Sequence, residues 1–238
     1  PFALLLEPVR IGPVTSPNRF YQVPHCNGMG WRTPEALSAM RGVKAEGGWG
    51  VVCTEEVEIS PRSEIAPNFE GRLWEARDIP PLAMMADACH AHGALAGIEL
   101  MFNGHAAPNR YSREVPFAPS HLPVRGHDPL QARAMDKSDI RAVRRWHRQA
   151  ALRARTAGFD LVYVYAGHDL ALPMHFISRR CNRRSDEYGG SLENRVRFLR
   201  ELIEDTRDAV GDRCGVVVRL AVEQLRGPDG ITAHGEGR

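Results

Sequence analysis

Residues capable of nucleophilic, acid–base and charge-stabilising chemistry recur in this chain where its apolar runs end. They are His25 and Cys26 after the first run, Glu55 and Glu56 after the second, Glu99 within the third, Tyr165 and His168 after the fourth, and Arg219 in the fifth. A thiolate is a nucleophile, an imidazole exchanges protons near neutral pH, and a phenol donates a hydrogen bond. A lone cysteine is more often an inert thiol, so Cys26 by itself assigns no function.

Alternating strands and helices must position these side chains. The predicted strands are apolar on both faces, as in a parallel sheet covered by helices, and span Phe20 to Val23, Gly50 to Thr54, Ala94 to Leu100, Leu161 to Tyr165 and Gly215 to Leu220. Apolar residues at helical spacing fill the intervals between these runs. The helices are predicted to begin after Thr33, at Pro80 and Pro81, after Ser138 and after Ser191, with the Thr and Ser residues as N-caps.

Two architectures accommodate such a pattern, the doubly wound sheet and the (β/α)8 TIM barrel. A doubly wound sheet needs a glycine-rich phosphate loop after its first strand. Gly28 and Gly30 begin such a loop but the third glycine is absent, so the dinucleotide signal is weak. The barrel is favoured, because the carboxyl ends of its strands converge on one mouth and would bring the chemical residues together.

Only about the first five β-α units of a barrel can be counted. An open five-stranded arc would leave an unpaired edge and an uncovered core. Residues 1–238 are therefore expected to be the N-terminal part of a larger protein, whose remaining barrel strands lie outside this sequence. Residues 102–136 are rich in Pro, Arg and His and are expected to form an excursion over the barrel mouth.

Composition narrows the class of protein. The 31 basic and 29 acidic residues of the 238 are well mixed, which predicts neither a nucleic-acid nor a membrane surface. The five cysteines are odd in number and form no C-x-x-C pair, which argues against disulfides and against a zinc or iron–sulfur site in this stretch. The apolar N-terminal run is too short for a signal peptide or a membrane span. A soluble, cytoplasmic protein is expected.

Two segments carry a resemblance to a known family. The opening run from Leu6 to Gly12 with Asn18-Arg19-Phe20, and the long run from Asn182 to Arg195, resemble the Old Yellow Enzyme family of FMN barrels. Within that family the chain is most similar to the amine dehydrogenases of the trimethylamine dehydrogenase type, through Gln22 to Cys26, Lys44 to Trp49, Gly93 to Gly97 and Gly158 to Tyr165. The run from Asn182 to Arg195 is diagnostic, but its tight turn and Ser191 cap favour a structural role.

The resemblance implies that the residues after the first strand bind FMN. Cys26 matches the cysteine whose sulfur is joined to the benzenoid ring of the flavin in that subgroup, so a covalent FMN is expected. The alternative is an unmodified thiol beside non-covalent FMN. Pro24 and His25 are expected to bind the cofactor as well, although His25 could equally be packed beneath it.

Glu99 and Arg219 lie in otherwise apolar strands, where an unpaired charge would be costly. The resemblance implies that Glu99 hydrogen bonds to the flavin pyrimidine, and that Arg219 stabilises the negative charge of the reduced ring. The alternative for both is a structural salt bridge, which they could make with each other.

Tyr165 and His168 match two members of the catalytic group of the amine dehydrogenases. They are expected to present the substrate nitrogen with its lone pair available while a hydride equivalent leaves the adjacent carbon. The aspartate that completes this group in the family lies beyond Arg238. A coincidental Tyr and His is the alternative.

Glu56 departs from the family pattern, because trimethylamine dehydrogenase has a tyrosine of its aromatic bowl at this position. An aromatic face suits a methylated ammonium, whereas a carboxylate prefers a cation with an N–H or a further polar group. Glu56 is therefore expected to bind a substrate other than trimethylamine, such as an N-methylated amino acid.

The resemblance implies FMN-dependent oxidation of a secondary or tertiary amine to an iminium, which water hydrolyses to an aldehyde and a dealkylated amine. A 4Fe-4S cluster and a nucleotide-binding region are expected outside this chain, an electron-transferring flavoprotein is the expected acceptor, and a homo-oligomer is expected. The first alternative is an NAD(P)H-dependent ene or dienoyl-CoA reductase on the same barrel. The second is a non-catalytic fragment without flavin.

Overall fold

A curled parallel sheet forms the centre of the molecule. The computed structural model describes residues 2–66, 70–227 and 230–235. The sheet has the strand order β11-β10-β6-β4-β3, with β5 beside β4. Its strands are β3 (Tyr21–Gln22), β4 (Val51–Glu58), β5 (Gly71–Arg72), β6 (Leu95–Met101), β10 (Leu161–Ala166) and β11 (Gly215–Leu220). All five predicted strands are present, although β3 is shorter than predicted and β4 continues to Glu58 rather than ending at Thr54.

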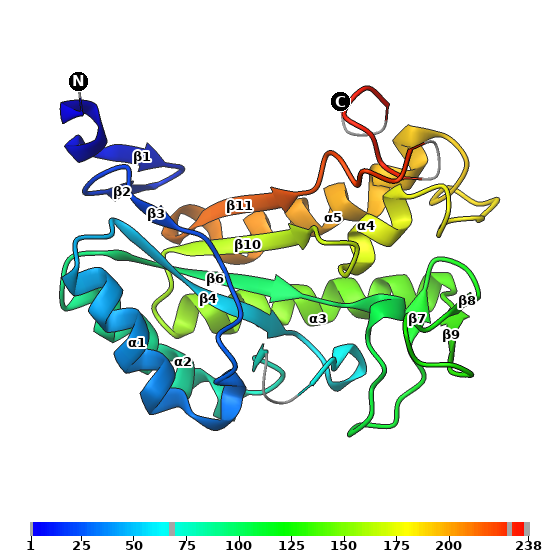
Figure 1. Ribbon diagram of the computed structural model, residues 1–238, viewed down its shortest axis with the longest axis horizontal. Helices are drawn as coiled ribbons and strands as arrows, with labels where there is room; N and C mark the ends of the chain where they lie inside the picture. The colour runs from blue at the N-terminus through cyan, green and yellow to red at the C-terminus, as the bar shows by residue number, and fades with distance from the viewer. Residues whose placement is uncertain (1, 67–69, 228–229, 236–238) are drawn as a thin grey trace.

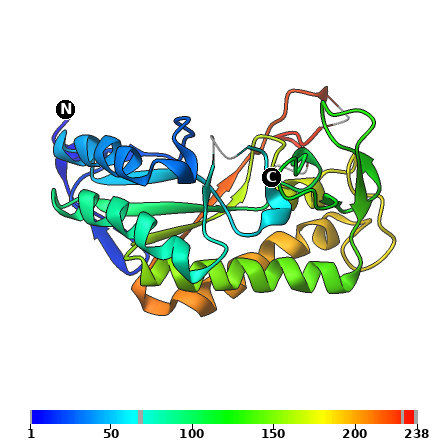
Figure 2. The same ribbon diagram turned by 90° about the horizontal axis from the view of Figure 1, so that it is seen from below.

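Helices cover the outer face of this sheet, as Figures 1 and 2 show. They are α1 (Pro34–Glu46), α2 (Ile79–His90), α3 (Lys137–Thr156), α5 (Leu192–Val210) and the short α4 (Leu172–Ile177). Fully buried alanines such as Ala150 and Ala154 let α3 pack closely on the apolar core. The sheet and its helices form a curled α/β half-barrel of the TIM type, in agreement with the predicted fold class. Among the described residues, no helix combines the length and apolar character needed to cross a membrane.

The helices begin close to the predicted positions, but two of the predicted capping residues are wrong. The Ser191 side chain accepts a hydrogen bond from the Asn194 amide at the start of α5, as predicted. For α3 the predicted cap, Ser138, was wrong, because the helix begins at Lys137 and Asp136 is its cap. Asp136 is extended and its carboxylate reaches two amides of the first turn, whereas Ser138 already lies inside the helix. Thr33 precedes α1, but its hydroxyl donates to the Met29 carbonyl instead of capping.

Two small sheets lie at opposite ends of the central one. The hairpin of β1 (Val9–Ile11) and β2 (Val14–Ser16) lies near the amino ends of the parallel strands (Figure 1). The sheet of β7 (Phe117–Ala118), β8 (Leu122–Pro123) and β9 (Gln131–Ala134) lies beyond their carboxyl ends. These last three strands belong to the segment 102–136, the expected excursion. The same end of the sheet also carries the candidate site residues.

Candidate active site

The inner face of the sheet changes from apolar to charged along the strands. Near the amino ends, Val51, Cys53, Leu161 and Tyr163 form a small buried cluster. Toward the carboxyl ends the pairs across neighbouring strands are Glu56 beside Glu99 and Tyr165 beside Arg219. Because side chains alternate between faces, these four follow the apolar cluster on the same inner face. The predicted convergence of Glu56, Glu99, Tyr165 and Arg219 is therefore found.

A bulge in β4 decides which glutamate faces inward. Cys53 pairs with Gly97 and Glu56 pairs with Glu99, so three residues of advance on β4 match two on β6. In a regular strand Glu55 would share the face of Cys53. The extra residue instead gives Glu56 the inner position, while Glu55 is buried against Arg41 of α1 at 3.4 Å.

Glu99 and Arg219 form a salt bridge on the inner face. Glu99 is fully buried, and its two oxygens accept hydrogen bonds from Arg219 Nη1 at 3.2 and 3.3 Å. The same nitrogen donates to the Pro24 carbonyl at 3.1 Å. Burial raises the pKa of Glu99 to about 7, which Arg219 opposes. The Arg219 side chain is 28% exposed, so part of its guanidinium is still accessible to a ligand.

Arg219, His168 and Tyr165 form a hydrogen-bonded chain with a defined direction. A guanidinium only donates, so Arg219 Nη2 donates to His168 Nε2 at 3.3 Å. Burial and Arg219 lower the pKa of His168, which keeps the imidazole neutral with its proton on Nδ1. That N–H donates to the Tyr165 hydroxyl oxygen, which leaves the Tyr165 proton for Glu56. The polarity therefore runs from Arg219 to the Glu56 carboxylate.

An open cavity of about 630 Å³ lies beside these hydrogen-bonded residues. Its lining includes Cys26, Glu56, Glu70, Arg125, His168 and Leu170. The Cys26 sulfur and one carboxylate oxygen each of Glu56 and Glu70 lie within 4.8 Å of one another. Partial burial and the carboxylates raise the pKa of Cys26 to about 12, so the free thiol keeps its proton at neutral pH.

His25 packs against α1 and is not among the residues that line this cavity. Its Nδ1 lies 3.0 Å from Gln22 Nε2 and 3.2 Å from Arg41 Nη1, and its Nε2 lies 3.3 Å from Lys44 Nζ. Burial and the two cations lower the pKa of His25. The fully buried Arg41 also donates to the His25 carbonyl at 2.8 Å, which fixes the segment before Cys26 on α1. This geometry corresponds to the packed alternative for His25, and its contact with a cofactor stays a prediction.

A buried aspartate that the sequence analysis missed supports the turn carrying His168. Asp169 accepts hydrogen bonds from Arg180 and Gln224, and it pairs with Arg226 at 3.0 Å and with Arg125 at 3.6 Å. His168 and Asp169 both have positive φ, 55° and 59°, which non-glycine residues rarely adopt. The contacts of Asp169 hold this strained turn in place. The residues that contact Asp169 lie elsewhere in the sequence, so no local sequence pattern predicts these contacts.

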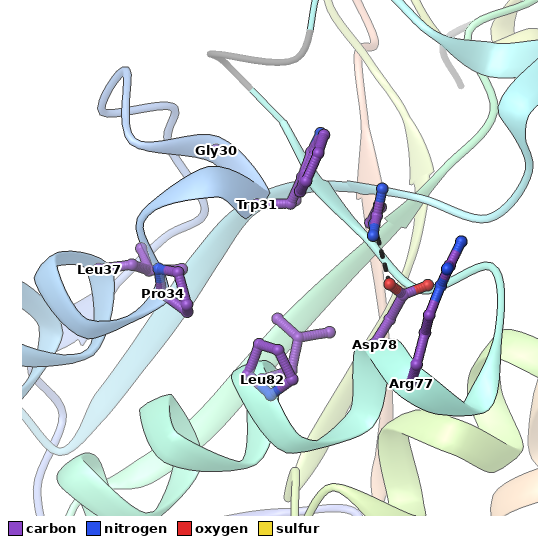
Figure 3. Close-up of a pocket in the computed structure, with 10 residues that line it drawn as sticks. Gly30, Trp31, Pro34, Leu37, Arg77, Asp78 and Leu82 are labelled. Carbon is purple, nitrogen blue, oxygen red and sulfur yellow. Dashed lines mark hydrogen bonds and ion pairs between the residues drawn. The ribbon is translucent and has the colours of Figure 1, made fainter. Parts of the chain in front are cut away.

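A second, smaller cavity lies between the amino ends of α1 and α2. It has a volume of about 100 Å³ and is lined mainly by apolar groups, including Trp31 and Leu82 (Figure 3). The Arg72 guanidinium lies 3.8 Å from the centre of the Trp31 ring and bonds to Asp78 at 2.9 Å. None of the predicted site residues lines it, so the chemistry belongs to the larger cavity.

The raised carboxyl pKa values predict how stability depends on pH. Burial raises the pKa of Glu56 and Glu99 to about 7 and that of Glu70 to about 8, from 4.5. Between about pH 4.5 and pH 8 the folded state therefore holds carboxyl protons that the unfolded state has released, so the contribution of these groups to stability falls as pH rises. We expect the free energy of unfolding of the flavin-free protein, measured in urea, to decrease from pH 6.5 to pH 8.

Buried histidines act in the opposite sense only below this window. Burial lowers the pKa of His105 and His147 to about 4, so their contribution rises with pH up to about 6.5 and is then constant. Glu70→Gln should flatten the decline above pH 6.5. A free energy of unfolding that increases from pH 6.5 to pH 8 would contradict the prediction.

Comparison with known proteins agrees with this geometry. Residues 4–235 match the NADH:flavin oxidoreductase / NADH oxidase family. The chain belongs to this family. The predicted resemblance to flavin-dependent oxidoreductases of the Old Yellow Enzyme type is thereby confirmed. The structure of morphinone reductase in complex with tetrahydroNAD is 28% identical, with a TM-score of 0.81. The match covers 92% of this chain and 64% of the morphinone reductase chain.

Three relatives with higher sequence identity to this chain than morphinone reductase are named as amine-oxidising enzymes. Dimethylamine dehydrogenase of Hyphomicrobium sp. (strain x) is 40% identical over 242 residues, covering 99% of this chain and 33% of that protein. Histamine dehydrogenase from Rhizobium sp. 4-9 is 54% identical with a TM-score of 0.95, covering 98% of this chain and 34% of that one. The 6-hydroxypseudooxynicotine amine oxidase (HisD) from Pseudomonas geniculata N1 is 49% identical with a TM-score of 0.97, at 100% and 36% coverage. The chain thus spans about a third of the length of these relatives.

Proposed function

We propose that this chain supplies the FMN site of an amine dehydrogenase. The enzyme would oxidise the C–N bond of a secondary or tertiary, N-methylated amine to an iminium, which water hydrolyses to an aldehyde and a dealkylated amine. The observation that carries this proposal is that Cys26 and His168, the latter bonded to Tyr165, share one cavity. The named amine-oxidising relatives support it. Electrons would pass to a 4Fe-4S cluster outside this chain and then to an electron-transferring flavoprotein.

The residues on the inner face fit FMN by their chemistry. The cavity of about 630 Å³ is large enough for a planar ring system, and Arg219, whose side chain is 28% exposed, hydrogen bonds to His168 in its lining. Arg219 would donate to the pyrimidine edge of the flavin, with Glu99 and the Pro24 carbonyl holding the guanidinium in place. Cys26 would attach the ring covalently. When bound, FMN supplies the electron sink for amine oxidation.

The residues of this chain would prepare the amine for oxidation. Glu56, whose pKa is about 7, can take a proton from a bound ammonium near neutral pH. Tyr165 donates to Glu56, and neutral His168 fixes the orientation of the Tyr165 hydroxyl. The substrate nitrogen would thus keep its lone pair available while the adjacent C–H bond breaks.

Anaerobic reduction of the full-length flavoprotein tests the proposal. Amines should bleach the flavin absorbance, and NAD(P)H should not. Bleaching by NAD(P)H and not by amines would support the ene reductase, an alternative that the similarity to morphinone reductase favours. A purified protein without flavin absorbance would support the non-catalytic fragment. Denaturation followed by mass measurement tests the covalent link separately, because flavin that washes away refutes it.

Glu56→Tyr is expected to change the substrate preference. Glu56 is buried beside the cavity, and a charge-assisted hydrogen bond from a substrate N–H contributes about 2 kcal/mol. The ratio of kcat/KM for a secondary amine over that for trimethylamine should therefore fall by about 30-fold. Steady-state kinetics with both amines measures this ratio. Glu56→Gln, which keeps the hydrogen bond but loses the charge, should have an intermediate effect, and an unchanged ratio in Glu56→Tyr would remove Glu56 from substrate recognition.

A further inference from the structure

We propose that Glu70 accepts the proton of the Cys26 thiol when the sulfur bonds to the flavin. This inference rests on the covalent attachment in the proposed function and adds the base that makes attachment possible. The Cys26 sulfur lies within 4.8 Å of a carboxylate oxygen of Glu70, and both residues line the same cavity. Glu70 is 3% exposed, so bulk water has little access to its carboxyl group.

Cys26 needs a base because its surroundings oppose ionisation. Reactive cysteines usually have a cation or a helix amino end beside them. The charged groups that influence Cys26 are Glu55, Glu56 and Glu70, and they raise its pKa together with burial. At a pKa of about 12, the thiolate fraction at pH 7 is on the order of 10⁻⁵. The neighbouring His25 cannot take the proton, because its ring lies against Arg41 and Lys44.

Glu70 is better suited to this role than Glu56. Glu56 accepts the Tyr165 hydrogen bond and is stabilised as an anion by Arg219, and its peptide N–H hydrogen bonds to the Cys26 sulfur. Glu70 has the higher pKa, about 8 against about 7, and is therefore the stronger base. One Glu70 oxygen accepts from the Ala66 amide at 3.2 Å, which orients the carboxylate.

The groups that interact electrostatically with Glu70 are further acids. The titratable groups that interact with it are Glu55, Glu56 and Glu58 of β4, together with Cys26, while His168 and Arg125 line the same cavity. Carboxylates facing one another raise the proton affinity of each. A proton arriving from Cys26 relieves this repulsion, which favours the transfer.

Attachment of the thiol to the flavin releases two protons and two electrons. The S–H bond breaks, its proton goes to Glu70, and the sulfur electron pair forms a bond to a benzenoid carbon of oxidised FMN. That carbon loses its hydrogen as a proton to water, so the flavin retains two added electrons. These electrons leave to dioxygen or to the acceptor used in turnover, and the attached flavin is oxidised again.

The rate of attachment tests the proposal without any measurement of amine oxidation. Full-length protein produced without riboflavin would be mixed with FMN, quenched in acid, and its covalent fraction measured by mass over time. Glu70→Gln should slow attachment about 100-fold at pH 7 while non-covalent FMN binding is unchanged. In the wild type the rate should rise up to about pH 8 and level off, because Glu70 is then ionised. In Glu70→Gln it should continue to rise tenfold per pH unit with the thiolate population.

Glu58→Gln provides the matched control. Glu58 is another buried carboxyl with a raised pKa, and its Ile65 hydrogen bond can be kept by a glutamine oxygen. This variant keeps the base but loses one of its carboxyl neighbours, so it should attach flavin at a rate much closer to that of the wild type than to that of Glu70→Gln. Equal rates in the wild type and Glu70→Gln, or a loss confined to Glu56→Gln, would overturn the role of Glu70. A wild type that attaches no flavin would instead refute the covalent link itself. If Glu70→Gln binds no FMN, Glu70→Asp keeps the base and should attach at a reduced but pH-limited rate.

Discussion

Replacement of His168 by Asn is expected to lower kcat/KM for the amine by about 100-fold, the lower end of the range for acid–base catalysis, because His168 orients the donor to Glu56 and does not itself transfer the proton. His168 links Arg219 to Tyr165, and through Tyr165 it orients the proton that Glu56 receives. Asparagine tolerates the positive φ of 55° at this position, so the strained turn should persist. The loss should therefore lie in the chemical step rather than in folding.

The rate of anaerobic flavin reduction by substrate in stopped flow measures that step directly. Flavin content and the free energy of unfolding should stay at wild-type values. Tyr165→Phe removes the donor to Glu56 but keeps the ring, so it provides a second disruption of the same chain and should be non-additive with His168→Asn. A His168→Asn protein with wild-type reduction rates would exclude His168 from catalysis.

The fold could be predicted because its signals are local. Strands such as Leu161–Ala166 are uninterrupted apolar runs, and they are buried on both faces in the structure. The barrel prediction then placed residues from distant strand ends at one mouth, and Glu56, Tyr165 and Arg219 do meet there. This convergence follows from topology alone and needs no knowledge of side-chain contacts.

Local geometry could not be predicted, because it depends on tertiary contacts. The sequence Glu55-Glu56 gives no sign of the bulge that turns Glu56 inward. The orientation of His25 depends on Arg41 and Lys44 of the following helix. The same limit applies to the Asp136 cap, since Asp136 and Ser138 are equally good capping residues and only the backbone conformation distinguishes them.

The acidic partner of Cys26 was missed for a further reason. Glu70 lies 44 positions after Cys26, in a stretch without a regular hydrophobic pattern. A single glutamate in such a stretch is normally exposed to solvent. Its burial and the proximity of Cys26 are evident only in three dimensions. Asp169 was overlooked similarly, although its position directly after His168 was a usable signal for a residue that fixes the turn.

Arg219→Met is expected to weaken FMN binding about 100-fold and to destabilise the flavin-free protein. The guanidinium is the only cation that the described residues place on the Glu99 carboxylate, and Glu99 is fully buried. Removing one partner of a buried pair costs about 3 kcal/mol, the lower end of the usual range, because Arg219 itself is 28% exposed. The cost should be smaller at pH 6 than at pH 8, since Glu99 has a pKa of about 7 and can take up a proton.

A double replacement separates the structural role of this pair from its role toward the cofactor. In Arg219→Met with Glu99→Gln no buried charge is left uncompensated, so the free energy of unfolding in urea should recover most of the loss. FMN affinity, measured by fluorescence quenching in a Cys26→Ala background that prevents attachment, should stay weak, because the donor to the flavin is still missing. If affinity recovered together with stability, Arg219 would be a structural partner of Glu99 only. Recovery of stability alone is the result that assigns Arg219 to the flavin.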